Sequence, residues 1–146
     1  MILIIGGAFQ GKKRFAEQLF PQERPGQGGE AKNIAWCDGE TASWEEFCQA
    51  AWCFHLPAMI RRQMDEAAGR EDGFLRDGFT REDFVKELLR FPKEKIVVAE
   101  EIGSGIVPMG AFQRKWREET GRICCLLAEN SSQVWRVIGG IGQRLR

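Results

Sequence analysis

The sequence opens with Met1-Ile-Leu-Ile-Ile-Gly-Gly-Ala-Phe-Gln-Gly-Lys-Lys13, an apolar run followed by a glycine-rich turn and a lysine pair. Gly6, Gly11 and Lys12 match the phosphate-loop pattern G-x-x-x-x-G-K-[ST] at each fixed position except the last. In such a loop, successive backbone N–H groups form a concave anion site, and the following helix adds its positive N-terminal end. We therefore predict a buried strand, a phosphate-binding loop and a helix.

The predicted phosphate site covers eight consecutive residues. They are Gly6, Gly7, Ala8, Phe9, Gln10, Gly11, Lys12 and Lys13. The glycines allow phosphate to approach the backbone, and Lys12 places an ammonium group on the outer phosphates. Lys13 stands where a hydroxyl residue normally ligates Mg²⁺. It either replaces part of the metal's charge or marks a loop that binds phosphate without turnover. The other interpretation of the whole stretch is an ordinary strand, turn and helix.

Composition predicts one globular domain over residues 1–146, with 43% hydrophobic and 29% charged residues. Twenty-one basic and 21 acidic residues give a net charge of zero, so we expect neither a nucleic-acid nor a membrane partner. The apolar start has no basic region and breaks at Gly6, unlike a secretory signal, which predicts a cytoplasmic protein. Five cysteines without a C-x-x-C spacing predict free thiols rather than a zinc site.

The periodicity of the rest of the chain predicts alternating strands and helices. We expect strands over 33–37, 95–99 and 133–138, helices over 43–54, 80–91 and 109–129, loops over 21–32 and 67–80, and an end loosened by the glycines at 139, 140 and 142. Ser43 and Thr80 are the expected N-terminal caps, with Glu46 completing a capping box. Gly121 interrupts the last helix, which indicates close packing or a bend. The order predicts a three-layer α/β/α fold of the P-loop NTPase type with a mostly parallel sheet.

Acidic residues follow two of the predicted strands, at the sheet edge where α/β proteins bind ligands. Asp38 comes after the second strand, and either holds a metal-bound water or is a turn residue before glycine. Glu100 and Glu101 end a later strand, and because neighbouring residues on a strand point to opposite sides, we expect at most one of them to face the cleft. We predict Asp38 and Glu101 as catalytic residues and Mg²⁺ ligands.

The chain contains one histidine, His55, at the end of an aromatic segment and ahead of Arg61 and Arg62. An imidazole in this setting serves in acid–base or covalent chemistry, or it is a hydrogen-bonded structural group. We include His55 with Lys12 among the predicted catalytic residues.

Several short motifs resemble those of the adenosylcobinamide kinase/adenosylcobinamide-phosphate guanylyltransferase family. They are Glu100-Glu101-Ile102-Gly103, Gly105-Ile106-Val107-Pro108, Trp116-Arg117, Gly121-Arg122, and Val134-Trp135-Arg136-Val137-Ile138 with Gly140-Ile141. The N-terminal strand and Gly6-Gly7-Ala8 fit the same family. The resemblance covers roughly the first twenty and the last fifty residues.

The resemblance implies a nucleotide-binding enzyme of cobalamin biosynthesis that uses ATP or GTP with Mg²⁺. Family enzymes phosphorylate the aminopropanol hydroxyl of cobinamide and then transfer GMP to that phosphate through a guanylylated histidine. The resemblance also implies a homo-oligomer, commonly a trimer, acting on a corrinoid substrate. Here Lys13 replaces the family's Ser or Thr, and Glu100 replaces an Asn. The loop over 21–32 has no histidine, so His55 is the only histidine available to accept GMP. The alternative is a non-catalytic relative that acts as a nucleotide-binding or assembly protein.

Overall fold

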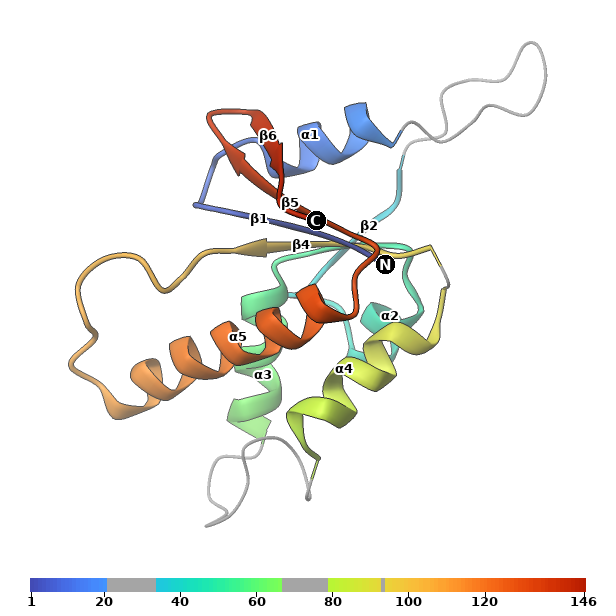
Figure 1. Cartoon of the computed structure of the whole chain (residues 1–146). Helices are drawn as coiled ribbons and strands as arrows, with labels where there is room; N and C mark the ends of the chain where they lie inside the picture. Colours follow the sequence, from blue (N-terminus) through green and yellow to red (C-terminus); the bar gives the residue numbers. More distant parts are fainter. Residues whose placement is uncertain (21–33, 67–78, 93) are drawn as a thin grey trace, which may run out of the picture.

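A six-stranded sheet forms the centre of the computed structural model, which describes residues 1–20, 34–66, 79–92 and 94–146 (Figure 1). The strands are β1 (Ile2–Gly6), β2 (Trp36–Asp38), β3 (Trp52–Phe54), β4 (Ile96–Glu100), β5 (Gln133–Ile138) and β6 (Ile141–Arg144). They lie in the order β2-β3-β4-β1-β5-β6, and only the β5–β6 pair is antiparallel. The predicted α/β fold with a mostly parallel sheet is confirmed.

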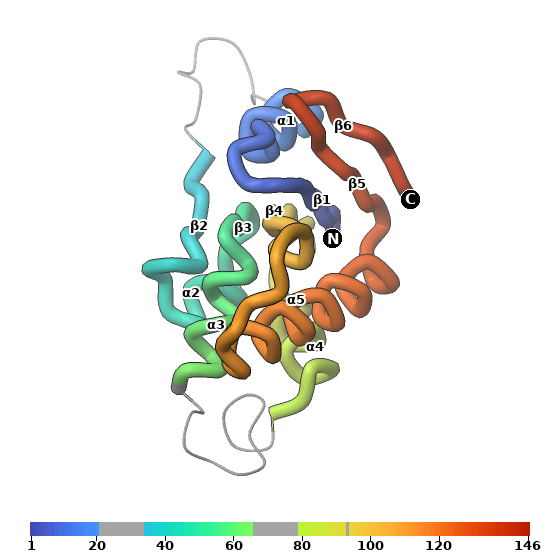
Figure 2. Tube along the Cα trace, turned by 90° about the vertical axis from the view of Figure 1, so that its left-hand side faces the viewer, coloured from blue at the N-terminus to red at the C-terminus, as the bar shows by residue number. Residues whose placement is uncertain are grey.

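Helices cover both faces of this sheet (Figure 2). The helices are α1 (Lys12–Leu19), α2 (Trp44–Gln49), α3 (Leu56–Glu66), α4 (Arg81–Arg90) and α5 (Ala111–Glu129). Helix α1 packs on one face and α2 to α5 pack on the other, which gives three layers. Because strand side chains alternate, β1 supplies both cores: Leu3 joins the larger cluster and Ile4 the smaller one around Ala16.

The predicted helix over 43–54 is wrong in its second half. Helix α2 ends at Gln49, and Trp52 to Phe54 form β3, between β2 and β4 in the sheet. The apolar run around Trp52 is buried because it is an inner strand, and its pairing with Trp36 and Ile96 overrides the helical spacing. This strand places His55 at the end of β3 rather than at the end of a helix.

The expected loosened C-terminal end is also wrong, because it forms the β5–β6 hairpin. Ile138 pairs with Ile141 across a two-residue turn, and both turn residues, Gly139 and Gly140, have positive φ (57° and 81°). Positive φ at both central positions is the geometry of a type I′ turn, whose twist matches that of the paired strands. The glycines therefore form the turn of a hairpin instead of loosening this end of the chain.

Other predictions hold within the described residues. Ser43 and Thr80 cap α2 and α4 through capping boxes, and α5 runs to Glu129 as expected. Strand β2 begins later than predicted and includes Asp38. All five cysteines are free thiols. The loop expected over 21–32 and most of that over 67–80 fall outside the described residues. Among the described helices, none combines the length and the apolar character needed to cross a membrane.

Candidate functional site

The predicted site residues gather at one edge of the sheet, where the parallel strands end. Gly6 ends β1, Glu100 ends β4, His55 follows β3, and Asp38 ends β2. The strand order β2-β3-β4-β1 makes these four ends neighbours. Ligands of open α/β sheets bind at this edge.

The segment from Gly6 to Gly11 is a compact turn between β1 and α1. Gly6 has φ 156°, and a Cβ there would lie 2.3 Å from the Val137 carbonyl oxygen, so a larger residue would force β1 and β5 apart. Gln10 anchors the turn to the β5–β6 hairpin: its carbonyl accepts from Gly140 N (3.0 Å), and its side-chain oxygen accepts from Gly139 N (2.6 Å). Phe9 sits at the fully exposed tip with φ 58°. The loop is therefore compact and is anchored to the neighbouring hairpin.

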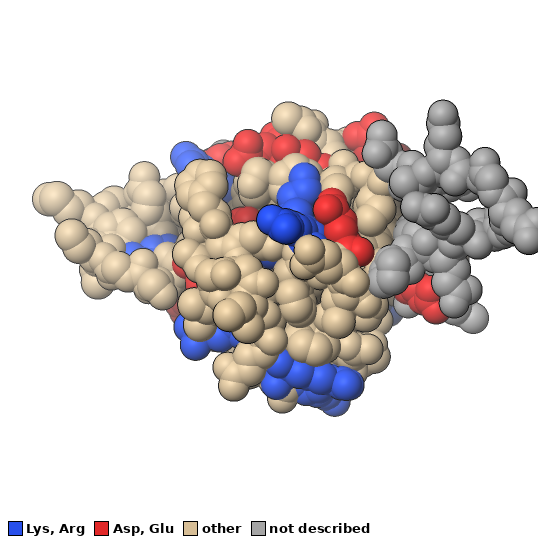
Figure 3. All heavy atoms as spheres, turned by 90° about the horizontal axis from the view of Figure 1, so that it is seen from above, with Lys and Arg blue, Asp and Glu red and all other residues tan. Residues whose placement is uncertain are grey.

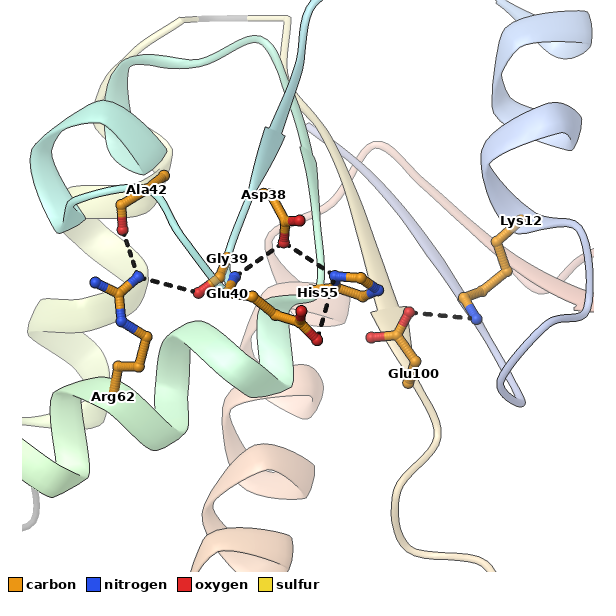
Figure 4. Close-up of polar contacts among 8 residues, drawn as sticks. All are labelled: Lys12, Asp38, Gly39, Glu40, Ala42, His55, Arg62 and Glu100. Atoms are coloured by element: carbon orange, nitrogen blue, oxygen red, sulfur yellow. Dashed lines mark hydrogen bonds and ion pairs between the residues drawn. The ribbon is translucent and has the colours of Figure 1, made fainter.

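Lys12 extends its side chain into the loop that precedes it. The side chain is 5% exposed, and Nζ donates to the Gly7 carbonyl at 2.7 Å and lies 3.5 Å from Glu100 Oε1 (Figure 4). Glu100 is placed there because it is the strand partner of Gly6 in the β1–β4 ladder. The buried ammonium group is therefore held between the Gly7 carbonyl of the loop and the Glu100 carboxylate.

Lys13 points to a different neighbour, although it is the next residue. Its Nζ lies 3.8 Å from the ring centroid of Phe54 and 5.1 Å from that of Trp36. Both rings attract the ammonium group through a cation–π interaction. The position that a Mg²⁺-binding hydroxyl takes in the phosphate-loop pattern therefore holds a cation that bridges α1 to the first residue of β2 and the last residue of β3.

Asp38 and His55 form a second group, one strand beyond β4. His55 Nδ1 lies 2.9 Å from Asp38 Oδ1, so Nδ1 donates and the other ring nitrogen is left for a further partner (Figure 4). Gly39 permits this approach, since a Cβ on it would lie 2.3 Å from the His55 carbonyl oxygen. Arg62 fixes the following turn by donating to the carbonyl of Ala42 at 2.6 Å.

Glu40 adds a third possible ligand beside this pair. Its Oε1 lies 3.7 Å from His55 Nδ1, and the ligand atoms of Asp38, Glu40 and His55 all lie within 4.8 Å of one another. One imidazole with two carboxylates suits a transition metal better than Mg²⁺, which prefers oxygen ligands alone. Without a metal, the same geometry orients the imidazole.

The structure does not bring Asp38 and Glu101 together as ligands of one ion. Strand β3 separates β2 from β4, a distance of two strand spacings, or about 10 Å. Glu101 is also turned toward β5, where its carboxylate lies 3.2 Å from Arg136 Nε. Glu100 is the carboxylate beside Lys12, whereas Glu101 pairs with Arg136, and both residues line the cavity between these strand ends and α5.

One cavity is lined by this glycine loop, and another lies by the strand ends next to it. A cavity of about 340 Å³ is lined by the loop, by Arg14 and Phe15 of α1, and by the hairpin glycines. Another of about 310 Å³ lies between the ends of β1 and β4 and helix α5. The larger cavity of about 930 Å³ is lined by α4 and the last turn of α5, away from these strand ends, so the chemistry does not favour it.

Buried thiols and a buried amine support the strands behind the site. Lys95 Nζ donates to the carbonyls of Phe47 (2.9 Å) and Cys48 (2.8 Å), and burial lowers its pKa. Burial raises the pKa of Cys53, on β3, and of Cys124, on α5, to about 12 in each case. These thiols stay protonated at neutral pH and act as core residues.

Comparison with known proteins extends over most of the chain. The family model described as "Cobinamide kinase / cobinamide phosphate guanyltransferase" matches residues 57–145, which run from α3 to β6. The "Bifunctional adenosylcobalamin biosynthesis protein CobU" of Salmonella typhimurium strain LT2 is 27% identical across the whole of this chain and 99% of its own length. The protein of the same name from Escherichia coli K12 is 37% identical over 57 residues, which are 39% of this chain and 32% of that protein.

Proposed function

This chain belongs to the cobinamide kinase / cobinamide phosphate guanyltransferase family, and from that premise we propose that it transfers phosphoryl and guanylyl groups from ATP or GTP to cobinamide in cobalamin biosynthesis. The observation that carries the proposal is Lys12, whose buried ammonium group lies inside a compact glycine loop at the start of a helix. The loop lies N-terminal to the residues that the family model matches, so its geometry supports the proposal independently.

In the first step, the nucleotide's phosphate chain lies in the loop formed by residues 6–13. The backbone N–H groups and Lys12 bind its oxygens, and the cavity beside Arg14 and Phe15 has room for part of the nucleoside. The hydroxyl oxygen of cobinamide attacks the γ-phosphorus, and the bond from that phosphorus to the departing nucleoside diphosphate breaks. Of the carboxylates at this edge, Glu100 lies beside Lys12 and is best placed to receive the hydroxyl proton.

In the second step, His55 accepts GMP. Its ring nitrogen Nε2 attacks the α-phosphorus of GTP and pyrophosphate leaves; the phosphate of cobinamide phosphate then attacks the same phosphorus, and the P–N bond breaks. Asp38 supports this role because its carboxylate accepts from Nδ1, which orients the ring and stabilises the cation that forms. The imidazole is 35% exposed, so a nucleotide can reach it.

We do not assign a shared Mg²⁺ site to Asp38 and Glu101. Each carboxylate is engaged elsewhere, Asp38 with His55 and Glu101 with Arg136. Lys13 stands at the hydroxyl position, so this chain's own residues do not form the usual Mg²⁺ ligand set around the loop. The change in nucleotide affinity on adding Mg²⁺ therefore tests whether this loop uses a metal ion as the phosphate-loop pattern with Ser or Thr does.

Lys13 also favours a second candidate function, in which the chain binds nucleotide or assembles with a partner without catalysis. Its ammonium group is held by Phe54 and Trp36, so it stabilises the contact of α1 with β2 and β3 without contributing a metal ligand. The proposals of a single domain, a cytoplasmic location and a trimeric assembly follow from composition and family resemblance, and they apply to both candidates.

One experiment separates the two candidates. Purified protein is titrated with GTP and ATP by calorimetry, with and without Mg²⁺, and is then incubated with each nucleotide and cobinamide while products are separated by chromatography. Binding with formation of cobinamide phosphate is expected. Binding without product under any of these conditions would support the non-catalytic candidate, and absence of both would remove both.

A further inference from the structure

The cavity between the strand ends and α5 is separate from the nucleoside cavity, which is lined by α1 and the hairpin turn. Its volume is about 310 Å³, and its lining includes Ile5 of β1, Glu100 of β4, the Glu101–Arg136 ion pair, and Thr120, Gly121 and Cys124 of α5. We propose that it receives the hydroxyl-bearing amide arm of the corrinoid acceptor. The inference rests on the phosphoryl transfer proposed above and assigns the acceptor to residues that family resemblance alone does not identify.

Glu100 connects this cavity to the phosphate loop. It lines the cavity, and its Oε1 lies 3.5 Å from Lys12 Nζ. Figure 4 shows its carboxylate directed at Lys12 from the end of β4. A hydroxyl group bound beside Glu100 is therefore one side chain away from the ammonium group that binds the outer phosphates. In-line phosphoryl transfer requires such an approach of the attacking oxygen.

Thr120 gives the cavity an unsatisfied polar group. The residue is 2% exposed, and its hydroxyl oxygen has no hydrogen-bond partner among the residues that the structure describes. A buried hydroxyl without a partner is unfavourable, and native proteins rarely leave one. The hydroxyl or amide of a bound arm would supply the missing hydrogen bond.

Gly121 is an exposed residue of α5 in the lining of the cavity. A Cβ built on this residue meets no heavy atom within 4 Å, so of the close packing or bend expected from the sequence, close packing is absent. Glycine inside a helix is unfavourable relative to alanine. Its presence at the lining of a cavity, with no neighbour that requires it, is consistent with space kept for a ligand.

The size of the cavity and the loop above it indicate how a larger acceptor would bind. About 310 Å³ holds a short side arm but not a corrin ring. The segment between β4 and α5 projects from the body of the molecule (Figure 3), and its Ile106, Val107 and Met109 are 96%, 69% and 97% exposed. Arg117 holds this segment by donating to the carbonyls of Gly103 and Ile106. The ring of the acceptor would lie against these apolar side chains while its arm enters the cavity.

The test uses two corrinoids that differ in this arm. Dicyanocobinamide carries the aminopropanol arm, and cobyric acid lacks it. Each is titrated by calorimetry into the wild-type protein and into Gly121→Leu, which fills the cavity with a better helix former. We expect the wild type to bind cobinamide more tightly, and Gly121→Leu to weaken cobinamide about tenfold or more while leaving cobyric acid within about twofold. Thr120→Val, which keeps the shape and removes the hydroxyl, is expected to weaken cobinamide by about three- to tenfold.

Cys125→Leu is the matched control, because Cys125 is an exposed residue of the same helix outside this cavity. It should bind both corrinoids as the wild type does. Nucleotide titration and thermal unfolding of every variant verify the fold. If wild-type protein binds cobinamide and the Gly121 and Thr120 variants bind it equally well, this assignment is wrong while the proposed function stands. If the wild type binds nucleotide but no cobinamide, both the assignment and the proposed acceptor are overturned.

Discussion

The phosphate loop and the Asp38–His55 pair lie at the same edge of the sheet but are built in different ways. The hairpin and the β4 end hold the loop: Gln10 accepts from the hairpin turn through its carbonyl and its side chain, and Gly6 accepts from Glu101 N at 3.0 Å. The other group is joined by the Asp38–His55 side-chain hydrogen bond and by Arg62, together with the backbone bond from Gly39 N to the Phe54 carbonyl. Each also contains one of the two described non-glycine residues with positive φ, Phe9 and His55. Such backbone strain is common at functional sites. The two regions correspond to the two roles that we propose, phosphate binding at the loop and guanylyl transfer at the imidazole.

The largest expected effect is on GTP affinity, and it comes from a substitution in the loop rather than elsewhere at this edge of the sheet. Lys12→Ala removes the buried ammonium group and should weaken GTP binding about 100-fold, because charge-assisted hydrogen bonds to phosphate are lost. Calorimetric titration measures the change. Lys115→Ala, an exposed lysine of α5, is the control. If Lys12→Ala and the wild-type protein bind GTP with equal affinity, the loop is not part of the nucleotide-binding site.

The next variants address the imidazole. Protein incubated with GTP labelled at the α-phosphate should retain label, and His55→Ala should retain none while binding GTP within about twofold of wild type. Asp38→Asn should slow labelling about tenfold or more, because the ring loses its orienting carboxylate. If His55→Ala still retains label, a residue other than His55 accepts GMP. If the wild-type protein retains no label, the non-catalytic candidate is favoured.

These two regions also differ in how far the sequence alone could predict them. The loop is contiguous, and its glycines and Lys12 carry a local pattern, so its turn and the following helix could be predicted. The contact between Asp38 and His55 depends on β3, whose apolar residues have helical spacing and become a strand only because β2 and β4 pair with them. The role of Glu100 likewise depends on its register with Gly6. Long-range pairing of this kind leaves no short-range signal.

A smaller effect is expected where the two regions touch, at Lys13. Lys13→Ser restores the hydroxyl of the phosphate-loop pattern and removes the cation from Phe54. We expect Mg²⁺ to increase the affinity of this variant for GTP about fivefold more than that of wild type. Lys13→Ala, which removes the cation without adding a ligand, is the control. If serine and alanine behave alike, the effect of position 13 comes from charge and not from metal binding.

The smallest effect concerns stability and depends on two thiols, the buried Cys53 of β3 and the half-buried Cys124 of α5. The folded-state pKa values of Cys53 and Cys124 are raised from 9.0 to about 12. The contribution of each protonated thiol to the free energy of unfolding is therefore fully present below pH 9 and is lost as pH rises toward 12. The loss is at most about 1.4 kcal/mol per pH unit for each thiol. Lys95 beside Cys53 acts oppositely, because its lowered pKa favours the folded state as pH rises. Urea unfolding at pH 8 to 10.5 should therefore show a shallower decline for Cys124→Ala than for wild type, and no change for the exposed Cys125→Ala. An unchanged slope in Cys124→Ala would contradict the assignment.

The most direct test is an NMR titration of isotopically labelled protein with inorganic triphosphate, which carries no nucleoside and no corrinoid. If the backbone amides of residues 7–13 form the anion site, their resonances should show the largest shifts, and those of residues 38–42 should change little. Shifts spread evenly over the surface, or absent from residues 7–13, would contradict the account.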